Sequence, residues 1–153
     1  MHWTLAIAAA VTAAALAFAA PRATAADARQ MEANKQAAVD FYDKAINQKD
    51  FDAASKYIGS RYVQHNPNAA DGPEGLKAFL GFLREKFPSY HSEIKRTFAD
   101  GDHVVLHVHN VPVPGARGRA IIDIFKFESG KIVEHWDVAQ EIPEKPANGN
   151  GMF

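Results

Sequence analysis

Two aspartates and a histidine occupy alternating positions in the strongest strand pattern of the chain, residues 120–140. Two runs of β-branched and aromatic residues flank a short Gly-containing turn, which predicts an antiparallel hairpin. Because side chains alternate faces along a strand, Asp123 shares a face with Phe125, and His135 shares one with Asp137. Carboxyls and an imidazole on partly apolar faces indicate acid/base chemistry in a pocket.

The strand pattern at residues 103–111 is also mixed, with histidines on one face and aliphatic residues on the other. If the mixed faces of the three strands align, His107 and His109 converge with the two aspartates and the histidine of the hairpin. The alternative is that this mixed face lies toward solvent and that the aliphatic face forms the only core.

The chemistry expected of these carboxyls follows from their apolar neighbours. Burial raises the pKa of a carboxyl by up to about 3–5 units, and a nearby protonated histidine lowers it again. Asp137 has no Ser or Cys beside it, which argues against acyl transfer. We expect Asp137 to be functional, whereas Asp123 fits a catalytic role and a purely structural one equally well.

The histidines raise a second possibility. His-x-His at positions 107 and 109, together with His65, resembles a set of zinc or iron ligands. The spacing lacks the downstream Glu of a cupin metal motif, so we expect no metal.

Composition and charge limit the classes of protein to which this chain can belong. The chain has 153 residues and a net charge of −1, which fits one globular domain and gives no basic excess for nucleic acid. An Ala-rich apolar run ends before Ala23-Thr24-Ala25, a small-x-small cleavage pattern, although no Lys or Arg precedes the apolar run. We expect residues 1–25 to be a signal peptide and the protein to be periplasmic or secreted, without a stable membrane anchor. The chain has no cysteine, and therefore no disulfide.

The elements that position the candidate residues are read from periodicity. Helices are predicted at residues 32–48, after Asp50, and at 71–87; strands are predicted at 61–67, 92–98, 103–111, 120–127 and 132–140. This order predicts an α+β fold in which a curved antiparallel sheet wraps around about three N-terminal helices and encloses a pocket. The aliphatic sheet face then needs a cover, and we expect a homodimer.

Several segments resemble the SnoaL-like polyketide cyclase family of the nuclear transport factor 2-like, cone-fold superfamily. They are YVQHNP (62–67), DGPEGL (71–76), LHVH (106–109), DIFKFESGKIVEHWDV (123–138) and Gln140. The resemblance spans about Lys35 to Pro143, within a domain expected at residues 30–143 that is followed by a disordered tail, 144–153.

The resemblance implies a cofactor-free and metal-free reaction. In cyclases of this type an aspartate on the last strand is the general acid/base of an aldol condensation, a role that passes to Asp137. The partner position on the preceding strand, often histidine, is Asp123 here. Ketosteroid isomerases of the superfamily have an aspartate base where this chain has Asn66, and an amide cannot be that base; their protonated oxyanion donor matches Asp123.

The sequence therefore predicts a lyase, isomerase or cyclase that acts on a small hydrophobic carbonyl compound through an enolate-like intermediate. Its catalytic residues are expected to be Asp137, Asp123 and His107, and its substrate-binding residues His65, Asn66, His109, His135 and Phe125. The alternative is a non-catalytic protein that binds a small hydrophobic ligand.

Overall fold

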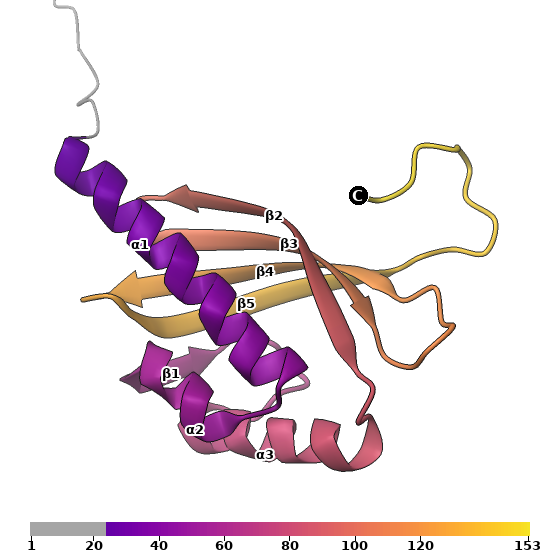
Figure 1. Cartoon of the computed structure of the whole chain (residues 1–153), viewed down its shortest axis with the longest axis horizontal. Coiled ribbons are helices and arrows are strands. Elements are labelled where there is room, and N and C mark those ends of the chain that lie inside the picture. The colour runs from indigo at the N-terminus through magenta and orange to yellow at the C-terminus, as the bar shows by residue number, and fades with distance from the viewer. Residues whose placement is uncertain (1–23) are drawn as a thin grey trace, which may run out of the picture.

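The computed structural model describes residues 24–153, which form three α-helices on one side of a five-stranded sheet (Figure 1). The helices are α1 (Ala25–Tyr42), α2 (Phe51–Ala54) and α3 (Gly72–Lys86), and a π-helical segment, Asp43–Asn47, continues α1. The strands are β1 (Ile58–Gln64), β2 (His91–Asp100), β3 (His103–Val111), β4 (Arg119–Glu128) and β5 (Lys131–Glu141). The predicted α+β class is confirmed.

The strand order is β1-β5-β4-β3-β2. The predicted meander of β2 to β5 is antiparallel throughout, whereas β1 pairs with β5 in parallel, which the sequence analysis did not predict. The β4–β5 turn has positive φ at Ser129 (49°) and Gly130 (74°), the geometry of a type I′ hairpin turn.

Local sequence explains the helix boundaries. Asp50 caps α2, the helix predicted to follow it, because its side chain accepts a hydrogen bond from Ala53 N (2.9 Å). Thr24 and Asp27 form a capping box that starts α1 seven residues before the predicted helix.

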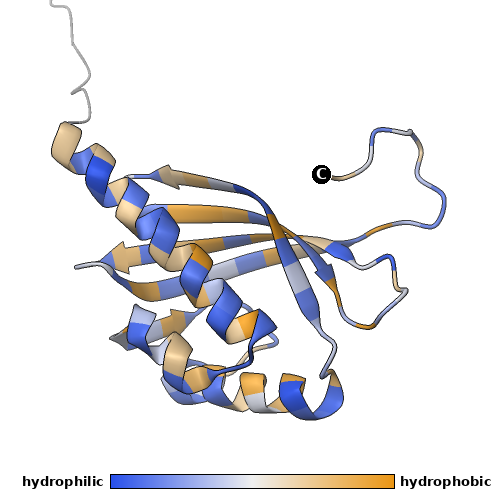
Figure 2. Cartoon of the chain, in the orientation of Figure 1, coloured by the Kyte–Doolittle hydropathy of each residue, from blue (hydrophilic) through white to orange (hydrophobic). Residues whose placement is uncertain are grey.

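The core lies between α1 and the concave face of the sheet, and Figure 2 shows hydrophobic residues both on α1 and on the strands behind it. Its largest fully buried side chains include Leu80, Val104, Leu106, Val108 and Phe125. No helix among residues 24–153 is both long and apolar enough to cross a membrane.

The aliphatic face of β3 therefore points inward, and the predicted alignment of its mixed face with those of β4 and β5 is wrong. The β3–β4 register pairs Leu106 with Asp123 and His107 with Ile122. Residues paired across a sheet share a face, so the aliphatic residues of β3 pack beside the acid and the aromatic rings of β4.

Candidate active site

A pocket of about 590 Å³ opens on the concave face of the sheet. Apolar residues from α1, α3 and the sheet form much of its wall. Its polar lining consists of Tyr42, Tyr62, Gln64, Asn66, Asn68, Tyr90, Arg119, Asp123, His135 and Asp137. A few polar groups in a mostly apolar cavity are typical of a small-molecule site.

The β4–β5 register builds the centre of the pocket. Asp123 lies directly opposite Asp137, and Phe125 lies opposite His135. The rings of Phe125 and His135 stack, with centroids 4.9 Å apart. The β4–β5 pairing thus brings together four of the eight predicted site residues, and all four line the pocket. A register shift between Lys126 and Phe127, which the sequence analysis did not predict, puts them on one face.

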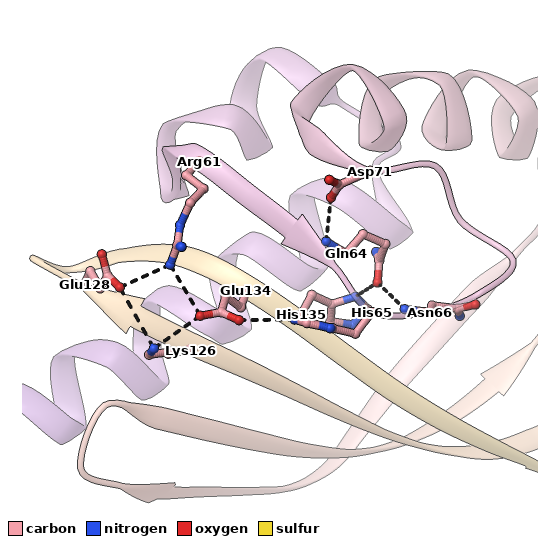
Figure 3. Close-up of polar contacts among 9 residues, drawn as sticks. All are labelled: Arg61, Gln64, His65, Asn66, Asp71, Lys126, Glu128, Glu134 and His135. Carbon is pink, nitrogen blue, oxygen red and sulfur yellow. Dashed lines mark hydrogen bonds and ion pairs between the residues drawn. The ribbon is translucent and has the colours of Figure 1, made fainter.

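Gln64, at the end of β1, determines which nitrogen of His135 carries a proton (Figure 3). Gln64 Oε1 accepts a hydrogen bond from the backbone N–H of Asn66 (2.9 Å) and lies 3.1 Å from His135 Nδ1. A carbonyl oxygen only accepts, so His135 Nδ1 must carry hydrogen. Nε2 is then the nitrogen that faces Asp123.

His135 Nε2 lies 3.1 Å from Asp123 Oδ1, and both side chains are buried. One proton between these two atoms is enough to form the hydrogen bond, and it can belong either to the Asp123 carboxyl or to the His135 imidazole. Asp123 Oδ2 is buried with no hydrogen-bond partner among the described residues. Burial raises the pKa of Asp123, as does the charge of Asp137, while the hydrogen bond and charge of His135 oppose the increase.

Asp137 is more open than Asp123. Its Oδ1 accepts a hydrogen bond from Asn66 Nδ2 (2.7 Å), and Asn66 Oδ1 in turn accepts from Asn68 N (2.8 Å). The Asn68 contact fixes the amide orientation of Asn66, so its NH₂ faces Asp137. The two carboxyls thus have different surroundings, which is the arrangement that lets one donate a proton and the other accept one.

Tyr42 and Tyr62 complete this end of the pocket. Burial raises the pKa of both phenols, and the negative charge of Asp123 raises it further, so both stay protonated near neutral pH. The sequence analysis missed Tyr62 and Gln64, although alternation along the strand predicted at 61–67 places positions 62, 64 and 66 on one face.

His107 and His109 do not line the pocket, which corrects their predicted convergence with the aspartates. The β3–β4 register places them on the outer sheet face. There His107 Nδ1 lies 3.1 Å from Arg96 Nη1, and His109 Nε2 lies 2.9 Å from the carbonyl oxygen of Arg117.

His65 also lies outside the pocket, in an exposed cluster of charges (Figure 3). Its Nε2 is 3.1 Å from Glu134 Oε2, and its ring stacks on Trp136 with centroids 4.4 Å apart. Arg61 and Lys126 also contact Glu134. Exposed ion pairs of this kind contribute little to stability, and the predicted contact of His65 with substrate is not supported by its position.

The only group of His, Cys, Asp and Glu side chains within residues 24–153 that is close enough to share a metal ion is Asp123, His135 and Asp137. Their ligand atoms lie within 4.8 Å of one another. The three histidines that the sequence suggested as ligands form no such group in this part of the chain. His135 already has hydrogen-bond partners at both nitrogens.

A model of the SnoaL-like polyketide cyclase family matches residues 36–145. No match is found among curated proteins.

Solved structures share the fold. A proposed polyketide cyclase from Bacillus cereus is 24% identical, with a TM-score of 0.61 over 70% of this chain and 74% of that one. A proposed ketosteroid isomerase from Kribbella flavida is 15% identical, with a TM-score of 0.63 over 78% and 86%. AclR, a proposed hydroxylase from Streptomyces galilaeus, is 19% identical, with a TM-score of 0.60 over 76% and 91%.

Proposed function

Because the chain belongs to the SnoaL-like polyketide cyclase family, we propose that it performs acid/base chemistry on a small carbonyl compound in the pocket, without a cofactor. Family membership supports a cyclase or isomerase-type role. The observation that carries the proposal is the direct pairing of Asp123 with Asp137, one buried against His135 and the other open to the pocket.

The proposed reaction begins with proton removal. The Asp137 carboxylate takes a proton from the carbon next to the substrate carbonyl, and Asn66 holds the carboxylate in place. The proton shared by Asp123 and His135 and the hydroxyls of Tyr42 and Tyr62 are donors for the oxygen that becomes negative. Asp137 then returns the proton to the product. His135 here takes the catalytic role that the sequence analysis expected of His107.

Deuterium exchange tests this function without knowledge of the natural substrate. 2-Tetralone and simple β-keto esters are incubated with the protein in D₂O, and loss of the α-proton signals is followed by NMR. We expect exchange faster than in buffer and unchanged after dialysis against EDTA. Loss of exchange with EDTA would favour a metal ion at Asp123, His135 and Asp137. Binding of the ketones without exchange would favour the ligand-binding alternative.

We also propose a homodimer whose interface is the outer face of the sheet. That face carries Ile122, Ile124, Trp136 and the 70%-exposed Val138. The aliphatic residues of β3 that the sequence analysis expected to need this cover are not on this face, because Val104, Leu106 and Val108 are buried in the core together with Ile132 of β5.

We expect Ile124→Lys to dissociate the dimer, because an interface would bury the new charge without a partner at a cost of several kcal/mol. Light-scattering chromatography gives the mass of each species. Ala33→Lys, at an exposed position of α1, is the control for added positive charge alone and should elute like the parent. A monomeric parent would contradict the proposal.

Export is also proposed. The signal peptide, residues 1–25, lies outside the described residues except for Thr24 and Ala25. We expect mature protein to begin at or next to Ala26, as intact-mass analysis of protein from the native cell will measure. Cleavage there removes Thr24 and with it the capping box of α1. Retention of Met1 would contradict export.

A further inference from the structure

Arg119 lies in the wall of the pocket, away from the paired aspartates. Its Nε donates to Asn110 Oδ1 (3.1 Å), and its Nη2 donates to the hydroxyl of Tyr90 (3.0 Å), which also lines the pocket. Asn110 is fully buried, and its own amide donates to His91 O and Ser92 Oγ. Arg119 is therefore held in one orientation by side chains that are themselves fixed.

The positive charge of Arg119 is not matched by an acid in this network. A guanidinium has five N–H groups, and two are used by Asn110 and Tyr90, which leaves three. No carboxylate within residues 24–153 forms an ion pair with it at 4.0 Å or less; Glu141, its partner in the β4–β5 register, is exposed. Of the described residues that line the pocket, Arg119 is the only one with a permanent positive charge.

The backbone conformation of Gly118, next to Arg119, brings the start of β4 close to β3. Gly118 has φ of 78°, and a Cβ there would collide with the carbonyl oxygen of Asn110. Only glycine allows β4 to start so close to β3. The β3–β4 register then pairs Asn110 with Arg119.

The two polar ends of the pocket lie on one face of one strand. Arg119 and Asp123 are four residues apart on β4, so their side chains point to the same side and their Cα atoms are roughly 13 Å apart at about 3.3 Å per residue. Ile121, between them, forms an apolar floor. A ligand that reaches both ends has a polar group at each and an apolar middle of about the size of two fused rings.

We propose that the substrate carries a carboxylate, which Arg119 binds with its free N–H groups while the Tyr90 hydroxyl donates a further hydrogen bond. Arginine forms paired hydrogen bonds with a carboxylate in a fixed geometry. The reacting carbonyl lies at the aspartate end. The inference about the reacting carbonyl rests on the proposed function; the carboxylate site itself does not.

The test compares two ligands of the same shape, 2-naphthoate and neutral 2-naphthamide, by calorimetry at pH 7. We expect the parent protein to bind naphthoate at least roughly tenfold more tightly, as charge-assisted hydrogen bonds require. Arg119→Gln should lose this preference and keep its affinity for naphthamide. Arg117→Gln is the matched control, because Arg117 is exposed, does not line this pocket and is two residues away; it should keep the preference.

The comparison of the two ligands does not depend on catalysis, and a second measurement, on the parent protein, covers a variant that fails to fold. If Arg119→Gln does not give the parent circular dichroism spectrum, the Nε–H resonance of Arg119 in the parent protein should shift with naphthoate and not with naphthamide. Naphthoate binding no tighter than naphthamide, or equal losses in Arg117→Gln and Arg119→Gln, overturns the proposal. Ketones that fail to exchange deuterium while naphthoate is still preferred would overturn the proposed reaction alone.

Discussion

Asp137→Asn is expected to lower deuterium exchange and turnover by about 10²–10⁴-fold, the usual contribution of one positioned acid/base group. Asparagine keeps the shape of the side chain and the oxygen that accepts the hydrogen bond from Asn66 Nδ2. It cannot accept a proton from substrate. The fold and the preference for naphthoate should therefore survive, and exchange by NMR measures the loss.

Asp100→Asn is the matched control for this variant. Asp100 is an exposed carboxylate at the end of β2 and does not line the pocket. It should exchange substrate protons at the parent rate. Undiminished exchange in Asp137→Asn would show that the base lies elsewhere, and Asp123 would be the next carboxyl to replace.

Asp123→Asn is expected to change how stability depends on pH. Burial raises the pKa of Asp123 in the folded state. The unfolded chain therefore loses this proton at a lower pH, near about 3.9. The contribution of Asp123 to stability is fully present below that pH and is lost as pH rises through the folded-state pKa, at about 1.4 kcal/mol per pH unit. Asparagine does not titrate, so this loss disappears.

Urea unfolding from pH 4.5 to pH 8 measures the effect. As pH rises, the free energy of unfolding of Asp123→Asn should increase relative to that of the parent. The free energy of unfolding of Asp100→Asn should change with pH in parallel to that of the parent. A parallel curve for Asp123→Asn would mean that His135 fully offsets the burial of the carboxyl. A reversed slope would mean that the folded protein prefers ionised Asp123.

The sequence predicted most of the fold because its signals were local. The apolar spacing on α3, the proline and caps near helix ends and the hairpin turn each depend on residues close in the chain. The pairing of Asp123 with Asp137 needs one more feature than the turn. The two-residue loop alone would place Asp123 opposite Trp136, and a register shift between Lys126 and Phe127 moves Asp137 into that position.

The errors came from contacts that no local pattern specifies. The sequence of the β3–β4 loop does not indicate the register in which β3 pairs with β4. A shift of one residue moves every side chain to the other face of the sheet. The positions of His107 and His109 were predicted wrongly for this reason. Gln64 reaches His135 only because β1 joins the far edge of β5 in parallel. Arg119 precedes the apolar part of its strand and was not considered, although positions 119, 121 and 123 share one face.

Among the described residues, the hydrogen bonds that orient the proposed catalytic groups span some of the largest separations in sequence, and this has a consequence for folding. Gln64 with His135 and Asn66 with Asp137 each join residues 71 positions apart. Closing a long loop costs more entropy than closing a short turn, so the β4–β5 hairpin is expected to form before β1 docks beside it. A refolding chain would then pair its two aspartates early and gain catalytic competence last, which makes activity a more stringent measure of complete folding than secondary structure.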